Sequence, residues 1–204
     1  MPQRVMVYVD GFNLYFGIRQ AGWKRLYWLD VAALASGLLR PGQQLAGVKY
    51  FTARISGPRD KQRRQNTYLE ATEEMGKCIK HFGQYLQVPQ TCQVCGSTHS
   101  VPKEKMTDVN IAVEMLSDAH QNLFDTALLI SADSDLAPPI QKIKQLFPTK
   151  RVIVALPPKR RSKLLTSNAD GYIRVSKANL TSSLLPENIK KTSGHVIQRP
   201  KEWK

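Results

Sequence analysis

The sequence predicts an α/β protein in which a mostly parallel sheet lies between two layers of helices. Short apolar runs, such as residues 4–9 and 126–130, have the length and composition of strands buried on both faces. Between these runs, apolar residues recur at helical spacing. Strands that alternate with helices are typical of parallel sheets with right-handed crossovers, which place helices on both faces. We therefore expect three layers.

Each element can be assigned from its own pattern. The first half is expected to contain a strand at 4–9, a helix from 14 to about 20, a helix within 23–39 that Asp30 caps, a strand at 48–53, a polar helix over 60–77, and a strand or hairpin arm at 79–88. The second half is expected to contain a helix that opens at 103–108 and ends near 120, strands at 126–130 and 151–156, a helix between them, a short helix at 164–169, and an edge strand at 172–175.

The chain length and net charge limit the domain organisation and the kind of partner that the protein can have. A chain of 204 residues fits one domain, expected over residues 1–178, followed by a basic tail at 179–204 with the composition of a mobile segment. The net charge of +14 favours a polyanionic partner, nucleic acid rather than a membrane, because no apolar run approaches spanning length. The start of the chain lacks a signal-peptide pattern, so we expect a cytoplasmic protein.

Two clusters of basic residues follow predicted strand ends. A solvated surface is the ordinary explanation for such a cluster. Binding is favoured here because both clusters fall at the edge of the sheet that also carries acidic residues. The residues expected to grip nucleic-acid phosphates are Arg54, Lys159, Arg160 and Arg161.

Acidic residues follow two of the predicted strands. Asp133 and Asp135 fall where the predicted strand 126–130 ends, and residues two apart in extended backbone point to the same side. Asp10 ends the first strand, in the place that Asp133 occupies in the later one. Paired carboxylates repel unless a cation or a proton joins them, and a hard divalent metal is the natural partner. The alternative is that these residues only cap helices.

Asp108 opens the periodic helix that ends near residue 120. Val109, Ala112, Val113 and Leu116 are expected to share one face of it, with Ile111 and Met115 beside them. Asp108 then lies on the inward side of the first turn, where a carboxylate needs a positive partner such as a metal. Helix capping by Asp108 is the alternative.

A cysteine pair suggests a small knuckle inserted at about residues 88–102. Cys92 and Cys95 have the spacing of zinc ligands, and Gly96 permits the tight turn that such sites use. A closed zinc site needs further ligands, for which His99, Cys78 and His81 are the candidates. The alternatives are a metal-free turn or exposed thiols.

Three segments together resemble a known family. They are residues 7–15, with Asp10, Gly11 and Asn13; residues 105–109, with Lys105 and Asp108; and residues 131–136, with Asp133 and Asp135. In this order they are similar to the NYN domain of the LabA-like branch, within the PIN-like nucleases. The cysteine knuckle ahead of Lys105 is a feature of some members. Met106 and Thr107 stand where many relatives carry glycine and a small apolar residue.

The resemblance implies a fold, an activity and a site. It implies a Rossmann-like sheet with strand order 3-2-1-4-5 and a metal-dependent ribonuclease that uses Mg2+ or Mn2+. The acidic set carries onto Asp10, Asp108, Asp133 and Asp135, with Asn13 as a polar neighbour. Ser134 and Lys105 are expected to contact phosphates. RNA is the expected partner, a structural zinc ion is an additional expectation, and the oligomeric state stays open, a homodimer included.

Two other functions remain compatible with the sequence. One is an RNA-binding module without catalysis, and the other is a regulatory scaffold that uses the same fold. Clustered carboxylates favour the ribonuclease, because a module that only binds a polyanion has no need of them.

Overall fold

A computed structural model describes residues 1–86, 88–100 and 105–204. The first half consists of β1 (Gln3–Asp10), α1 (Gly11–Gln20), the short helix η1 (Lys24–Tyr27), α2 (Val31–Gly37), β2 (Gln43–Thr52), α3 (Arg59–Glu74) and β3 (Ile79–Phe82). A hairpin of β4 (Gln84–Thr91) and β5 (Thr98–Lys105) follows. The second half consists of α4 (Thr107–His120), β6 (Thr126–Ile130), η2 (Ser134–Leu136), α5 (Ala137–Leu146), β7 (Arg151–Leu156), α6 (Lys163–Asn168) and β8 (Gly171–Arg174).

The central sheet has the order β3-β2-β1-β6-β7-β8, and all its neighbouring strands are parallel. This confirms the predicted α/β class and the order 3-2-1-4-5, with β8 as a further strand at the edge. The chain runs outward from β1 in both directions, so β1 and β6 flank the point where the strand order reverses. Ligands of open parallel sheets bind at the carboxyl ends of the strands beside such a point.

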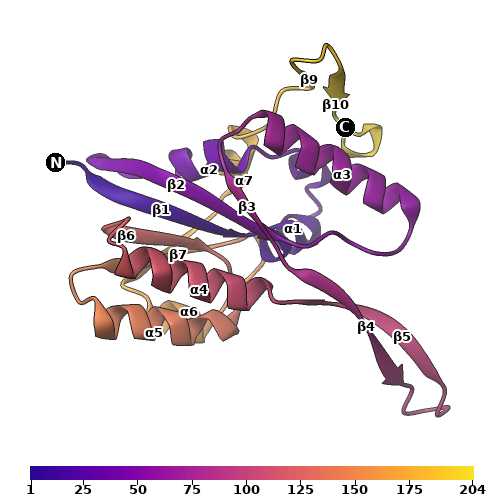
Figure 1. Ribbon diagram of the computed structural model, residues 1–204, viewed down its shortest axis with the longest axis horizontal. Helices are drawn as coiled ribbons and strands as arrows, with labels where there is room; N and C mark the ends of the chain where they lie inside the picture. The colour runs from indigo at the N-terminus through magenta and orange to yellow at the C-terminus, as the bar shows by residue number, and fades with distance from the viewer.

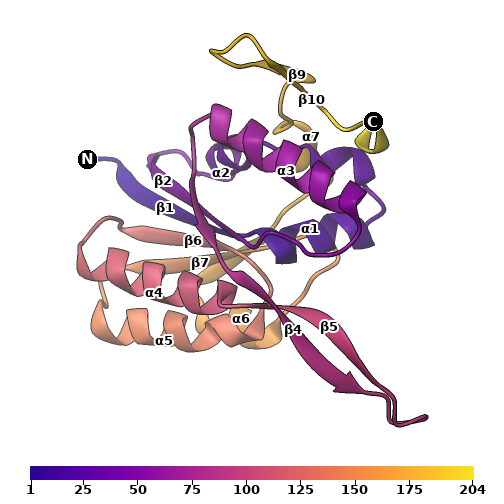
Figure 2. The same ribbon diagram turned by 45° about the vertical axis from the view of Figure 1, so that its right-hand side comes forward.

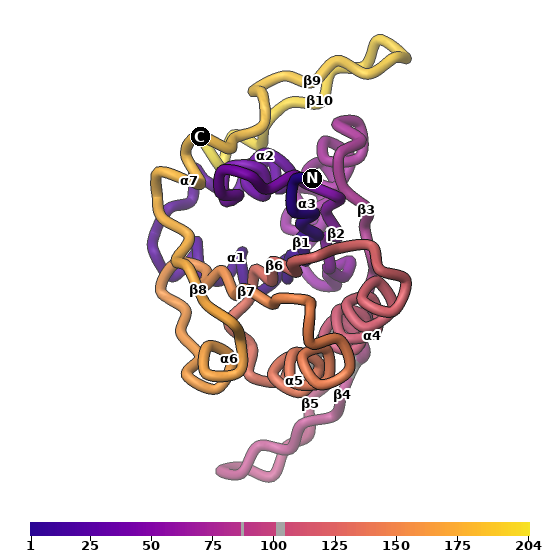
Figure 3. The backbone as a smooth tube through the Cα atoms, turned by 90° about the vertical axis from the view of Figure 1, so that its left-hand side faces the viewer, coloured from indigo at the N-terminus to yellow at the C-terminus, as the bar shows by residue number. Residues whose placement is uncertain are grey.

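Helices cover both faces of the sheet (Figure 3). One apolar cluster packs α1, α2 and α3 on their face, with the side chains of Leu14, Leu34 and Tyr68 buried in it. The other packs α4, α5 and α6, around Met115 and Ile140. The three expected layers are present.

The buried face of α4 differs from the prediction. Val109 and Val113 are 61% and 57% exposed, whereas Ile111 and Met115 are fully buried. Asp118 shares the inward side, where it accepts hydrogen bonds from Lys49 at 2.7 Å and from the Tyr8 hydroxyl at 2.8 Å. Because Asp118 is charged, the inward face of α4 does not read as an apolar stripe in the sequence. The burial of Asp118 is tolerated because its charge is paired. The helix also begins at Thr107, after Met106 turns the chain with a φ of 76°.

The β4–β5 hairpin extends away from the body of the protein (Figures 1 and 2). Its strands pair antiparallel, from Gln84 with Lys105 to Thr91 with Thr98. The segment expected as a third strand or hairpin arm therefore contains both: β3 joins the sheet, and β4 belongs to the hairpin.

The C-terminal segment corrects the prediction of a tail. From residue 177 onward the chain forms α7 (Lys177–Thr181), a hairpin of β9 (Asn188–Lys190) and β10 (Val196–Gln198), and η3 (Lys201–Trp203). Leu180, Ile197 and Trp203 are buried in the cluster that also holds α1 to α3. Each apolar side chain sits in a separate short element, so no periodicity marks the segment in the sequence. Among the described residues, no helix has both the length and the apolar character needed to cross a bilayer.

Candidate active site at the carboxyl edge of the sheet

A hydrogen-bonded network joins the ends of β1 and β6. Val9 pairs with Ile130 in the sheet, so the next residues, Asp10 and Ser131, lie side by side. The Ser131 hydroxyl donates to Asp10 Oδ2 at 2.8 Å, and both side chains are buried. The position in β6 that matches Asp10 is therefore Ser131. This corrects the expectation that Asp133 occupies the equivalent place.

Asp133 joins the network through its backbone. Its amide donates to Ser131 Oγ at 3.0 Å, so one hydroxyl links it to Asp10. Asp10 caps α1 by accepting from the Asn13 amide at 2.9 Å, and Asp133 caps η2 by accepting from the Asp135 amide at 3.1 Å. Both aspartates therefore cap helices, and the Ser131 hydroxyl links the Asp10 carboxylate to the backbone of Asp133 at the same edge of the sheet.

Asn13 and Arg160 add a neutral and a basic group to this edge. Asn13 Oδ1 accepts from the Ala132 amide at 3.2 Å and from Arg160 Nε at 3.3 Å. We call Asp10, Asn13, Ser131, Asp133 and Arg160 the acidic network. The sequence analysis selected four of these residues and gave no role to Ser131, whose signal was its position at the end of the strand that pairs with β1.

Two glycines permit the close approach of α1 to its surroundings. A Cβ on Gly11 would lie 2.7 Å from the Phe51 carbonyl oxygen, so the start of α1 fits against β2 because this residue has no side chain. A Cβ on Gly17 would lie 2.7 Å from the Pro158 carbonyl oxygen. The loop that carries Arg160 can therefore reach Asn13.

The other predicted site residues lie on elements beside this edge of the sheet. Ser134 and Asp135 are exposed on η2, and Asp108 is half-buried in the first turn of α4, a helix that packs against β1 and η2. Lys105 is exposed at the end of β5. Lys159 and Arg161 are exposed beside Arg160.

Arg54 is held by other contacts. It donates to Asn66 Oδ1 at 3.0 Å, and its guanidinium lies 5.3 Å from the centre of the Phe82 ring. It is exposed after β2 and is not hydrogen-bonded to the acidic network.

The predicted cluster of four metal-binding carboxylates is not assembled. Within residues 1–86, 88–100 and 105–204, no three His, Cys, Asp or Glu side chains are arranged to hold a metal ion. Asp10 and Asp133 nevertheless fit a smaller site, because protein-bound Mg2+ commonly uses one or two carboxylates and keeps several waters.

The predicted zinc ligands do not converge either. Cys92 and Cys95 lie at the turn of the β4–β5 hairpin, whereas Cys78 packs against the core cluster of α1 to α3. Burial raises the pKa of Cys78. His99 is exposed on β5, and the described residues supply no third ligand to the cysteine pair. At this turn Cys95 is exposed and Cys92 is half-buried.

The fold and this edge define an α/β protein with carboxylates at the switch point of a parallel sheet. The NYN domain family model matches residues 4–178. The chain therefore belongs to the NYN domain family, which is part of the PIN-like nuclease superfamily.

Two individual proteins are similar to this chain. The 6-hydroxy-3-succinoylpyridine 3-monooxygenase HspA of Pseudomonas putida (strain DSM 28022 / S16) is 26% identical over 181 residues, which cover 70% of this chain and 56% of HspA. The chain thus spans little more than half of that relative. The crystal structure of VPA0982, a protein of unknown function from Vibrio parahaemolyticus RIMD 2210633, superimposes with a TM-score of 0.57 and 20% identity, covering 90% of this chain and 97% of that one. At this identity the likeness concerns the fold.

Proposed function

We propose that this protein hydrolyses RNA phosphodiester bonds with Mg2+ or Mn2+, as a member of the LabA-like branch of the NYN family. The observation that carries the proposal is the acidic network at the switch point, where the Ser131 hydroxyl links Asp10 and Asp133. The net charge of +14 supports a polyanionic substrate.

Asp10 and Asp133 are the residues that would hold the divalent cation. Such an ion, when bound, makes a water molecule acidic and polarises a phosphoryl oxygen. Asp10 is fixed by the hydrogen bonds from Ser131 Oγ and the Asn13 amide, so its carboxylate is oriented before substrate arrives.

Arg160 brings a positive group to this carboxylate edge through its contact with Asn13. Its Nε contact with Asn13 leaves the rest of the guanidinium to contact a phosphate oxygen, for which its planar fork is suited. Lys159 and Arg161 would extend this positive charge along the backbone of a bound RNA. Lys105 and Ser134 are the further phosphate contacts in the proposal. Contacts of this type favour RNA binding that weakens as salt rises and depends little on sequence.

Cleavage of labelled single-stranded RNA tests the proposal. The wild type is incubated with Mg2+, with Mn2+ and with EDTA, and Asp10→Asn is assayed beside it. We expect cleavage only with metal, and a loss on the order of 10²- to 10³-fold in the variant.

Asp30→Asn provides the matched control. Asp30 is also a buried helix-capping aspartate, since it accepts from the Ala32 and Ala33 amides at the start of α2. The same substitution there has a comparable effect on folding and should leave cleavage intact. Salt-sensitive RNA binding without any cleavage by the wild type would contradict the proposal and indicate a non-catalytic RNA-binding module. Absence of both would indicate a scaffold.

A further inference from the structure

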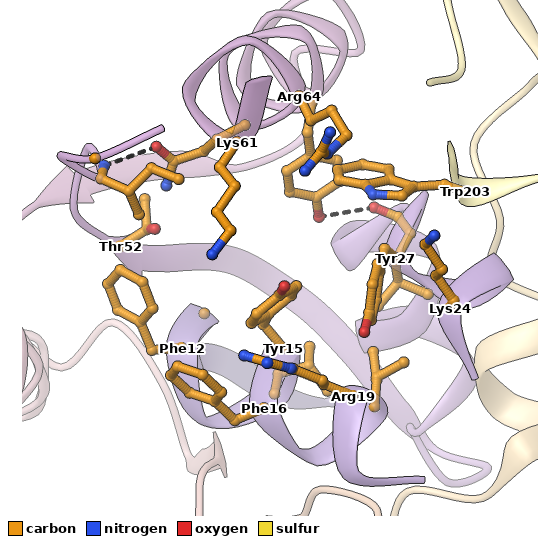
Figure 4. Close-up of a pocket in the computed structure, with 18 of the residues that line it drawn as sticks. Phe12, Tyr15, Phe16, Arg19, Lys24, Tyr27, Thr52, Lys61, Arg64 and Trp203 are labelled. Carbon is orange, nitrogen blue, oxygen red and sulfur yellow. Dashed lines mark hydrogen bonds between the residues drawn. The ribbon is translucent and has the colours of Figure 1, made fainter. Parts of the chain in front are cut away.

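A cavity of about 840 Å³ lies beside α1, bounded by α3 and by the C-terminal η3 (Figure 4). Its volume falls within the range of about 300 to 1,000 Å³ typical of small-molecule sites. The sheet contributes Tyr50 and Thr52, which lie near the carboxyl end of β2. Ligands of parallel sheets bind at this end of the strands. We call it the aromatic cavity.

Aromatic rings from distant parts of the chain form one wall of the aromatic cavity. The rings of Tyr15 and Tyr27 are 4.9 Å apart, and Trp203 meets Tyr27 edge-on at 5.7 Å. Tyr15 and Phe16 are 39% and 40% exposed, although large aromatic side chains are usually more buried. Burial raises the pKa of Tyr27, so its phenol is neutral at physiological pH. This wall therefore offers uncharged surfaces for a planar ring.

Basic side chains point into the aromatic cavity from opposite sides. Figure 4 shows the ammonium group of Lys61, on α3, and the guanidinium of Arg19, on α1, directed toward its centre. The acidic lining residue is Glu202, which already pairs with Arg64 at 3.0 Å. No carboxylate in the described part of the chain lies within ion-pair distance of Lys61 or Arg19. An anion placed between these two groups would meet two positive charges.

We propose that the aromatic cavity binds one nucleotide. The base would lie against Tyr15 and Tyr27, because aromatic side chains stack on bases with little sequence preference. The phosphate would lie between Lys61 and Arg19, which supply charged hydrogen-bond donors. The same chemistry is presented by a free nucleoside monophosphate and by one nucleotide of an RNA strand. This inference goes beyond the proposed hydrolysis and does not depend on it, since it rests on the cavity residues alone.

Isothermal titration calorimetry in EDTA, with the whole chain, tests nucleotide binding without metal or cleavage. We expect adenosine 5′-monophosphate to bind with a dissociation constant below about 1 mM, and adenosine to bind at least about tenfold more weakly. Lys61→Ala should weaken binding by about tenfold or more, and Tyr15→Ala by about 5- to 100-fold. Both side chains are exposed, so neither substitution is expected to prevent folding.

Matched substitutions control for charge and for loss of an aromatic ring. Lys77→Ala removes a charge from the exposed residues after α3, and Tyr172→Ala removes an exposed ring from β8. Neither residue lines the aromatic cavity, and both variants should bind the nucleotide as the wild type does. Equal binding of adenosine and its monophosphate, or equal binding by the cavity and control variants, would overturn the proposal.

Two further experiments identify the source of the nucleotide and test a different class of ligand. Competition between adenosine monophosphate and an RNA oligonucleotide supports a nucleotide of the strand as the occupant, and independent binding supports a free nucleotide. Nicotinate serves as a simple aromatic carboxylate. If nicotinate binds and the nucleotide does not, the cavity is a site for small aromatic acids and the proposal is wrong.

Discussion

The two sides of α1 present opposite chemistry. Asp10, Asn13 and Gly17 face β6 and the loop of Arg160, whereas Phe12, Tyr15, Phe16 and Arg19 line the aromatic cavity. Residues three and four apart share a face of a helix, so these two sets form separate stripes. One short helix thus carries an acidic edge suited to chemistry on a phosphate and an aromatic, basic wall suited to holding a base. The difference suggests that cleavage and nucleotide binding can be separated by substitution.

Among the variants that keep both carboxylates, Ser131→Ala should reduce RNA cleavage the most while leaving nucleotide binding unchanged. The Ser131 hydroxyl orients Asp10 and Asp133, and loss of such a supporting hydrogen bond typically costs about 10- to 100-fold in activity. We expect kcat for RNA cleavage to fall by this amount, with nucleotide affinity unchanged in calorimetry.

Thr126→Val is the control for Ser131→Ala. Thr126 begins the same strand, and its buried hydroxyl has no hydrogen-bond partner among the described residues. Its removal should leave cleavage at the wild-type rate. Equal loss in both variants would mean that the network is structural.

Gly17→Ala should have an intermediate effect, on both stability and cleavage. The added methyl group would lie 2.7 Å from the Pro158 carbonyl oxygen and displace the loop that brings Arg160 to Asn13. Overpacking of this kind costs about 1 to 3 kcal/mol in the free energy of unfolding. Denaturant unfolding and cleavage assays measure the two effects.

Gly37→Ala should raise the free energy of unfolding, whereas Gly17→Ala should lower it. Gly37 ends α2, and no atom lies within 4 Å of the position of its Cβ. Alanine there should stabilise the protein by up to about 1 kcal/mol, because it favours helix more than glycine does. A stabilising Gly17→Ala would show that the loop adapts freely and would remove this argument for the position of Arg160.

Alkylation of Cys95 should have the smallest effect on RNA cleavage and nucleotide affinity, because the hairpin turn belongs neither to the acidic network nor to the aromatic cavity. Hydrogen bonds from Ser97 lower the pKa of Cys95 to about 7, so its thiolate forms near neutral pH. We expect the rate of reaction with iodoacetamide to rise through a midpoint at about pH 7 and to exceed the rate at Cys78, whose pKa burial raises. Mass spectrometry of the labelled peptides measures both rates.

Ser97→Ala should move this midpoint upward, because the side-chain hydrogen bond that stabilises the thiolate is lost while the backbone hydrogen bond remains. RNA cleavage and nucleotide affinity should not change on labelling. A midpoint unaffected by the substitution would contradict the assigned cause of the low pKa.

The sequence was sufficient to predict the sheet and much of the acidic network, because both depend on local patterns. Apolar runs of strand length marked β1, β6 and β7; Asp10 ends β1, and Asp133 lies three residues after the end of β6. The order of the strands and the place of Asn13 came from the resemblance to the NYN family, which residues 4–178 now confirm.

Features that depend on contacts between distant segments escaped prediction. The inward face of α4 carries Asp118, whose burial is explained by its partners Lys49 on β2 and Tyr8 on β1. The aromatic cavity needs Trp203 from the C-terminal segment to stand beside Tyr27, and isolated apolar residues gave no sign that this segment folds back. The four-carboxylate cluster was expected from the ends of two strands, the first turn of a helix and the resemblance to the NYN domain, and none of these fixes how the Asp108 side chain lies relative to β1.

Parallel measurement of RNA cleavage and nucleotide affinity in two variants tests the account most directly. Asp133→Asn should lower kcat on the order of 10²- to 10³-fold and keep the wild-type affinity for adenosine monophosphate. Lys61→Ala should weaken that affinity by about tenfold or more and keep the wild-type kcat. An Asp133→Asn protein that cleaves RNA at the wild-type rate, or one that loses nucleotide affinity along with cleavage, would contradict the separation of the two sides of α1.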